Sequence, residues 1–315
     1  MPRLFSAYVI VDWSAAAKPT TGADSVWIGV LKRDVRFRMT FEAFNPPTRS
    51  EAETRLATIL DDLKKRSERA LVGFDFPLGF PRGFAEALKL SGEQPWRAAW
   101  DQVDKMVKDK PNNLNNRFGV ASEINRRITG GPFPFWGCPP KDTLTTLQPK
   151  KTRPHGPDDL PEFRHAELAA KGAASIWKTY YNGSVGGQAI LGIPVARRLR
   201  QARGEAVKAW PFETGFKALT EADLAGVDVV LADVYPSLIK PQGAVGDFAD
   251  LLGGEQRPVV RGVNFAKCRP LGVGHTVAVG EPAPRVDARP EAVDAPVARQ
   301  SAGQELVPGV AAVRP

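Results

Sequence analysis

The chain has 315 residues, of which 43% are hydrophobic and 25% charged, and its formal net charge is +8. These values are typical of a soluble globular protein with a sizeable core. No apolar run approaches the roughly 18 residues that a membrane span requires, and the N-terminus lacks a signal-peptide pattern. We therefore expect a cytoplasmic protein without a membrane segment. Its two cysteines, Cys138 and Cys268, form neither a disulfide framework nor a zinc-binding pattern.

The positive charge is concentrated in one part of the chain. Residues 141–217 carry 13 Lys or Arg against 7 Asp or Glu. A basic region that faces an acidic site suits a phosphate-bearing partner, because neutralising phosphates releases counterions. A solvated basic surface without a partner is the alternative.

The first quarter of the chain shows the patterns of three strands, a helix and a fourth, buried strand. The third strand alternates apolar and polar residues, which is the period of a half-buried strand. The helix is expected to begin at Ser50, with Glu53 completing a capping box, and to end at Arg66. The predicted strands are 7–13, 25–32, 35–44 and 70–75. This order predicts an α/β fold with a ribonuclease H-like mixed sheet, an antiparallel meander followed by parallel strands.

A large insertion, mainly helical and irregular, is expected at about 83–215, before a further strand at 227–233. The helical candidates within it are 83–90, 96–108, 162–171, 176–181 and 194–203. A stretch rich in Pro and Gly, 130–161, is long for an unstructured loop and favours a binding or lid role. Residues 281–315 contain no aromatic residue, so we predict a disordered tail after an ordered domain at 1–280.

Three apolar strands each deliver an aspartate at or next to their carboxyl end: Asp12, Asp75 and Asp233. The crevice outside these strand ends is where α/β folds place ligands. Converging carboxylates repel each other unless a divalent cation lies between them, and Mg²⁺ prefers oxygen ligands. The pattern therefore predicts a metal site, with capping of helices or turns as the structural alternative for each residue.

Several weaker signals lie in the insertion. Glu213, in the segment WPFET, is a fourth catalytic candidate or a helix cap. The segment NGSVGGQ (182–188) is a Gly-rich turn whose backbone N–H groups could hold a phosphate with help from Lys178, or a plain flexible turn. The aromatic residues of GPFPFWGCPP could stack on bases or pack as a hydrophobic loop. His155 and His165 have no partner at metal-ligand spacing and are interpreted as surface residues.

Five motifs occur together over residues 8–240. They are YVIVDWSAA (8–16), GFDFPLGFP (73–81), SIWKTYYNGSVGGQAILGIP (175–194), WPFET (210–214) and DVYPSL (233–238). Together they resemble a bacterial family of unknown function that is described as predicted nucleases with a ribonuclease H-like fold. The resemblance implies that the three aspartates line the site. It also implies that a loop facing them contains Gly183, Ser184, Gly186, Gly187 and Gln188.

The leading functional hypothesis is a metal-dependent phosphodiester hydrolase, a nuclease using Mg²⁺ or Mn²⁺. Asp12 and Asp233 would be the principal metal ligands, and Asp75 a further ligand or the base for water. The substrate, nucleic acid or another phosphate-bearing molecule, would be held by Ser14, Lys178 and the Gly-rich loop. Further basic surface is expected from Arg197, Arg198 and Arg200. Two alternatives stay open: a phosphate- or nucleotide-binding enzyme of cofactor biosynthesis, and a non-catalytic binding module.

Overall fold

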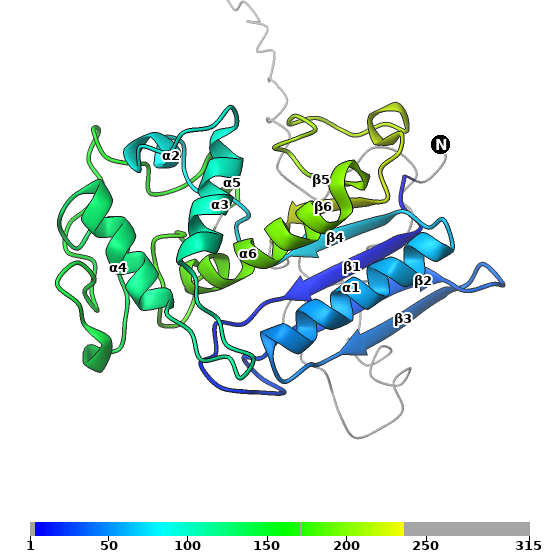
Figure 1. The fold of residues 1–315 in the computed structure, drawn as a ribbon, viewed down its shortest axis with the longest axis horizontal. Coiled ribbons are helices and arrows are strands. Elements are labelled where there is room, and N and C mark those ends of the chain that lie inside the picture. Colours follow the sequence, from blue (N-terminus) through cyan, green and yellow to red (C-terminus); the bar gives the residue numbers. More distant parts are fainter. Residues whose placement is uncertain (1–3, 171, 236–315) are drawn as a thin grey trace, which may run out of the picture. The chain divides into compact units, whose positions relative to one another are not determined.

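A computed structural model describes residues 4–170 and 172–235, which form a six-stranded mixed sheet with helices on one face (Figure 1). The strands are β1 (Ala7–Asp12), β2 (Trp27–Arg33), β3 (Met39–Phe44), β4 (Ala70–Phe74), β5 (Val207–Ala209) and β6 (Val229–Asp233). Their order in the sheet is β3-β2-β1-β4-β6-β5. The β1–β2 and β2–β3 pairs are antiparallel, whereas β1, β4, β6 and β5 run parallel. The predicted ribonuclease H-like topology is confirmed.

The helices are α1 (Arg49–Lys65), α2 (Phe84–Ala87), α3 (Pro95–Met106), α4 (Arg117–Ile128), α5 (His165–Ala169) and α6 (Gly186–Arg203). Both α1 and α6 cross the same face of the sheet, and α3 packs against α6 (Figure 1). Because β1, β4, β6 and β5 run parallel, their carboxyl ends lie at the same edge of the sheet. That edge faces the α4 region of the insertion.

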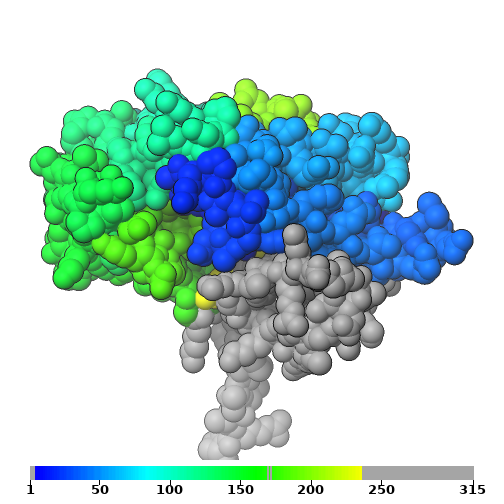
Figure 2. All heavy atoms as spheres, turned by 90° about the horizontal axis from the view of Figure 1, so that it is seen from below, coloured from blue at the N-terminus to red at the C-terminus, as the bar shows by residue number. Residues whose placement is uncertain are grey.

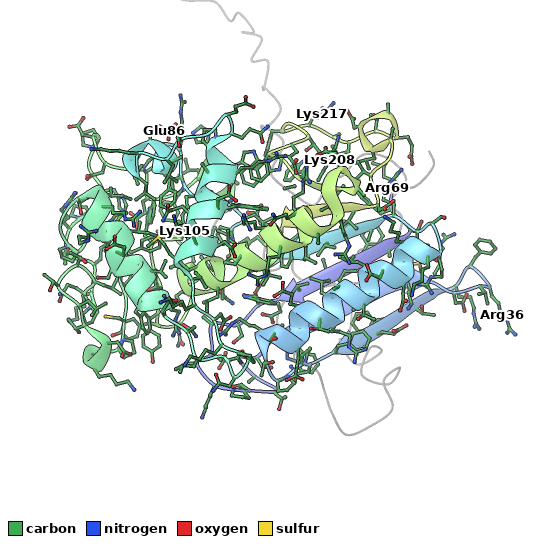
Figure 3. The ribbon with its side chains drawn as sticks, in the orientation of Figure 1. Arg36, Arg69, Glu86, Lys105, Lys208 and Lys217 are labelled. Carbon is green, nitrogen blue, oxygen red and sulfur yellow. The ribbon has the colours of Figure 1, made fainter. Side chains whose placement is uncertain are left out.

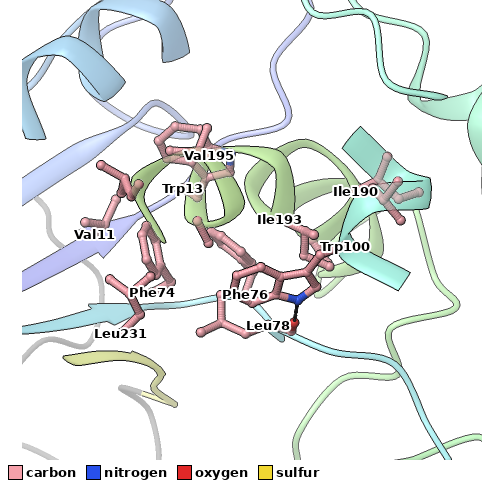
Figure 4. Packing of buried hydrophobic residues seen from close by; sticks show 14 of the residues in the cluster. Val11, Trp13, Phe74, Phe76, Leu78, Trp100, Ile190, Ile193, Val195 and Leu231 are labelled. Atoms are coloured by element: carbon pink, nitrogen blue, oxygen red, sulfur yellow. Dashed lines mark hydrogen bonds between the residues drawn. The ribbon is translucent and has the colours of Figure 1, made fainter. Parts of the chain in front are cut away.

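The core lies between the sheet and these helices. Alternate residues of the central strands point into it, as the period of two in a strand requires: Val9, Val11, Val72, Phe74, Val229 and Leu231. The apolar stripe of α1 and the buried face of α6 complete the cluster. Figure 4 shows Val11, Phe74 and Leu231 packed together, with Trp13 and Phe76 continuing the cluster toward Ile193 and Trp100.

The third strand is shorter than predicted. β3 begins only at Met39, and the chain before it forms the tip of the β2–β3 hairpin. Val35 and Phe37 are 96% and 78% exposed there, and Phe37 has a φ of 61°. Arg36, beside them, extends away from the sheet (Figure 3). The alternation of apolar and polar residues therefore predicted a strand that begins too early. The structural reason is the turn at Asp34, whose carboxylate accepts the Arg36 and Arg38 backbone N–H groups.

The predicted N-cap of the first helix, Ser50, is wrong by two residues. The N-cap is Thr48, whose hydroxyl accepts the Glu51 backbone N–H at 3.2 Å and donates to the Glu51 carboxylate at 3.0 Å. Two overlapping Ser/Thr-x-x-Glu patterns were present, and tertiary contacts selected the earlier one. The reason is the neighbouring Arg49, which is buried and must lie inside the first turn.

The insertion is more helical and shorter than predicted. Helix α4 was not expected, although Val120, Ile124 and Ile128 repeat at helical spacing. Helix α6 begins at Gly186 rather than at Pro194, which lies inside it, because residues 186–196 are buried almost all round and so show no amphipathic period. Residues 207–209, placed within the insertion, pair with β6 and belong to the sheet. The candidate 176–181 forms no helix.

Within residues 4–170 and 172–235, no helix has the length and apolar character needed to cross a bilayer. The predicted tail at 281–315, and the part of the expected 1–280 domain after residue 235, lie outside the described residues.

Candidate functional site at the carboxyl ends of the strands

A cleft of about 2040 Å³ opens where the parallel strands end. Its lining includes all three predicted aspartates, Asp12, Asp75 and Asp233. The other walls come from the loop after β1, the start of α4, the α5 region and the turn before α6. The cleft therefore lies at the place where folds of this class bind ligands.

Asp12 and Asp75 form a close carboxyl pair. Val11 and Phe74 are partners in the β1–β4 ladder, so the next residue of each strand lies side by side. The Asp75 backbone N–H donates to the Val11 carbonyl at 3.1 Å, and Asp75 Oδ1 accepts the Trp13 N–H at 2.8 Å. Burial and the negative charge of Asp12, with a side-chain hydrogen bond between the two acids, raise the pKa of Asp75 well above its usual range. The pair therefore favours sharing one proton.

Each of these two acids is followed by a buried aromatic residue. The side chains of Trp13 and Phe76 lie in the core, with ring centroids 6.3 Å apart (Figure 4). Helix α6 passes so close to Phe76 that a β-carbon at Gly192 would overlap its ring. The aromatic anchors fix the strand ends, and through them the direction of the two carboxylates.

Asp233 is placed differently from the other two aspartates. It pairs in register with Phe74, so it is one residue out of step with the Asp12–Asp75 row. Its carboxylate accepts a 2.5 Å hydrogen bond from Arg164 Nη2. Arg164 also binds Glu167, and these two acids together raise its pKa despite its burial. An ion-paired Asp233 thus ties the insertion to the end of β6.

The described residues contain no group of three or more Asp, Glu, His or Cys side chains arranged to hold a metal ion. The structure thus brings two of the three predicted ligands, Asp12 and Asp75, into direct contact and pairs the third with an arginine. Mg²⁺ usually binds proteins through one or two carboxylates and keeps several waters. The Asp12–Asp75 pair fits that donor set, and the metal stays a prediction.

The loop that follows Asp12 is held by Arg49, a residue that no sequence motif singles out. Arg49 is 2% exposed and forms a two-pronged ion pair with Asp109, at 2.6 Å for each nitrogen. The same guanidinium donates to the backbone carbonyls of Ser14, Ala16 and Asn113. The polar segment 110–116 is therefore an ordered support for the cleft wall.

The Gly-rich segment lies next to the loop that follows Asp12, and only some of its residues line the cleft. Gln188 Nε2 donates to the Trp13 carbonyl at 2.5 Å. Gly183, Ser184 and Gln188 line the cleft, as does Ser14. In Figure 2 the dark-blue residues that follow β1 lie beside the green surface of the insertion.

Gly186 and Gly187 serve packing rather than the cleft surface. A β-carbon on Gly186 would overlap the Ile176 carbonyl, and one on Gly187 would lie 2.8 Å from the Thr179 carbonyl oxygen. Lys178 also does not line the cleft: its ammonium donates to the Asn182 carbonyl at 2.6 Å and lies over the Trp136 ring. The expectation that Lys178 faces the aspartates is not supported by this geometry.

The basic residues of α6 do not form a free positive surface, so that expectation is wrong. Arg197 pairs with Asp101 and Asp104. Arg198 pairs with Glu53 and Asp104, and Arg200 with Glu205 and Glu213. These arginines attach α6 to α1, α3 and the strand β5 region instead.

Glu213 lies outside the cleft lining and has a structural environment. Its carboxylate accepts hydrogen bonds from Arg97, Arg200 and the Ala209 backbone N–H. Burial opposes ionisation, yet these hydrogen bonds, that of Arg200 first, lower the pKa of Glu213. The geometry favours a structural role over a catalytic one, but the partners are two arginines and the N–H of a β5 residue rather than the first turn of a helix.

The aromatic residues of the Pro-rich loop are packed. Phe133 and Phe135 are buried, which confirms the hydrophobic-loop alternative. His155 is half-buried against the Phe133 ring rather than at the surface, whereas His165 is exposed and lines the cleft.

Comparison of the chain with protein-family models, with curated proteins and with solved structures found no match. The function of the chain is therefore inferred from the geometry of the cleft.

Proposed function

We propose that the cleft is the active site of a hydrolase that acts on phosphate esters, with a phosphodiester of nucleic acid as the substrate class. The observation that carries the proposal is the Asp12–Asp75 pair. Two carboxyl groups in hydrogen-bonding contact, at the ends of adjacent parallel strands and on the wall of a large cleft, form an acid–base pair whose members differ in proton affinity.

The roles follow from the contacts of each acid. Asp75 is held by the Trp13 N–H and keeps the proton of the pair, which leaves Asp12 as the anionic member. An ionised carboxylate at this position can accept a proton from a water molecule that attacks the ester phosphorus, while the P–O bond to the leaving alcohol breaks and that oxygen takes a proton from solvent. Asp75 orients its neighbour through their shared hydrogen bond. We therefore assign Asp12 as the base and Asp75 as the positioning acid.

A divalent cation fits the same two residues. Asp12 and Asp75 would hold it through carboxylate oxygens, and bound there it supplies charge stabilisation for the phosphoryl group and lowers the pKa of water. The cation would also offset the repulsion from Asp12, which together with burial raises the pKa of Asp75. With a cation bound, both acids would therefore be ionised and Asp75 would act as a ligand, whereas its role as the positioning acid belongs to the pair without a metal.

The experiment compares Asp12→Asn and Asp75→Asn with the wild-type protein, each tested with Mg²⁺ and Mn²⁺. Hydrolysis of single- and double-stranded DNA and RNA and of bis(p-nitrophenyl) phosphate is measured alongside calorimetric metal binding. We expect hydrolysis by the wild type and not by either variant, and metal binding that is lost or strongly weakened in both variants. Arg38→Met, on the exposed β2–β3 hairpin, is the control and should hydrolyse the substrate as the wild type does. Absence of hydrolysis from the wild type on every substrate, or unchanged metal affinity in both variants, would contradict the proposal.

A further inference from the structure

Arg117, the first residue of α4, is a buried cation without an anionic partner. It is 8% exposed and lines the cleft. Its Nη1 donates to Asn115 Oδ1 at 3.0 Å, and its Nε has no hydrogen-bond partner. Within the described ranges no carboxylate forms an ion pair with it. Burying a guanidinium is costly unless it is paired, so its position needs an explanation.

The difference from the other buried arginines is plain. Arg49 satisfies its guanidinium with one carboxylate and three backbone carbonyls, and Arg164 binds two carboxylates. Burial, and after it the positive charge of Arg49, lowers the pKa of Arg117 to about 10, although Asp142, Tyr180 and Asp109 act in the opposite direction. The nearby acids therefore offset the cost of burying this guanidinium only in part.

Arg117 lies against the first turn of α6. Its Cδ is 3.3 Å from the position of a β-carbon on Gly187, and the Cβ of Ala15 is equally close to that position. The helix has 18 residues, and its N-cap, Val185, provides no side-chain hydrogen bond. The Gly186 N–H already donates to the Lys178 carbonyl at 2.9 Å, so the helix dipole and the later N–H groups of this turn are what favour an anion. A glycine at 187 is what permits the arginine and the Asp12 loop to approach this turn.

We propose that Arg117 and the first turn of α6 form an anion subsite that takes a phosphate group of the substrate. The inference depends on the proposed function of the cleft, because the subsite lies beside the loop that directly follows Asp12. A bound phosphate would give the guanidinium its missing partner through charge-assisted hydrogen bonds. The positive charge of Arg117 would also offset the repulsion between an anionic substrate and the Asp12–Asp75 pair.

The rings around the subsite indicate that the phosphate belongs to a nucleotide unit. The Arg117 guanidinium carbon lies over the Phe118 ring, 4.2 Å from the ring centroid. Tyr180 and Tyr181 line the same wall, pack against each other and are 37% and 45% exposed. Exposed aromatic faces beside a phosphate position are the surfaces on which bases stack.

The test measures binding, so that it is independent of hydrolysis. Arg117→Met, Arg117→Lys and the matched control Arg126→Met, at the exposed end of the same helix, are compared with the wild type. The probes are inorganic phosphate, a nucleoside 5′-monophosphate and a short single-stranded oligonucleotide, in calorimetry without divalent cations. Hydrogen bonds to charged groups contribute about 1.5–3 kcal/mol, so Arg117→Met should weaken binding at least tenfold. Arg126→Met should bind as the wild type does, and the nucleotide should bind more tightly than phosphate.

The melting temperature separates a ligand-binding role from a structural one. Because Arg117 is buried without an anion, Arg117→Met should melt at or above the wild-type temperature, and phosphate should raise the melting temperature of the wild type only. Equal phosphate affinity in wild type and Arg117→Met, or no binding of any probe by the wild type, would overturn the subsite. If Arg117→Met does not fold, Arg117→Lys decides, with weaker binding expected because lysine lacks the planar fork. Asp12→Asn should still bind phosphate. Phosphate binding with no hydrolysis by the wild type would therefore support the subsite while contradicting the hydrolase proposal.

Discussion

Arg49 provides the strongest single prediction, because one buried side chain holds the wall that carries Asp12. Arg49→Met keeps most of the volume but removes five hydrogen bonds, two of them to Asp109. Removing one partner of a buried ion pair costs about 3–5 kcal/mol, because the remaining charge is left uncompensated. For a domain of this size, each kcal/mol lowers the melting temperature by about 2–4 °C. The expected decrease is therefore about 6–20 °C.

The assay is urea denaturation followed by tryptophan fluorescence, with thermal melting as a second measurement. Arg38→Met is the control, because Arg38 is 69% exposed and pairs with Asp34 on the hairpin; no measurable change is expected there. Asp109→Asn should reproduce a large part of the Arg49 effect. A loss below about 1 kcal/mol in Arg49→Met would show that the Asp12 loop does not depend on this anchor, and the reasoning from buried pairs would fail.

Three further predictions concern the pair, the core and the ion-pair hub. The folded pKa of Asp75 is raised above the unfolded value, so the wild type binds more protons when folded and loses stability as the pH rises from about 4 through the raised pKa. Asp75→Asn should remove that loss in metal-free buffer; an identical pH profile of melting would contradict it. Gly192→Ala forces a methyl group into the Phe76 ring and should cost about 1–3 kcal/mol or more in urea denaturation, whereas Gly215→Ala, with open space around it, tests the left-handed backbone alone. Glu213→Gln leaves Arg97 and Arg200 without their carboxylate and should cost about 1.5–3 kcal/mol, measured in the same way; an unchanged midpoint would show that the hub is dispensable.

The sheet was predictable because its signals are local. Apolar strands, their order and the single crossover helix limit the topology to few arrangements. The aspartates at the strand ends follow from the same pattern. What the sequence could not supply is register: whether Asp233 pairs with Phe74 or with Asp75 decides which carboxylates meet, and a shift of one residue reverses the face.

The cations in and behind the cleft were also beyond sequence reasoning. Arg49, Arg117 and Arg164 lie in unrelated segments with no common spacing; the fold places Arg117 and Arg164 in the cleft lining and Arg49 behind the Ser14 backbone. The basic excess of 141–217 was a misleading signal, since Arg197 and its neighbours on α6 pair with acids of distant helices. Net charge describes a segment, whereas a free cation is defined by what lies within a few ångströms of it.

The alternation at the two central strand ends links chemistry to folding. In Asp12-Trp13 and Asp75-Phe76 the first residue belongs to the cleft and the second to the core, one peptide apart. A deletion or insertion of one residue in β1 or β4 would exchange these positions, burying an acid in the core and placing an aromatic ring in the cleft. A one-residue insertion or deletion in either strand would therefore disrupt both the cleft and the core. We therefore expect a substitution at Asp12 or Asp75 to be tolerated by the fold only when the contact of the adjacent aromatic ring is kept.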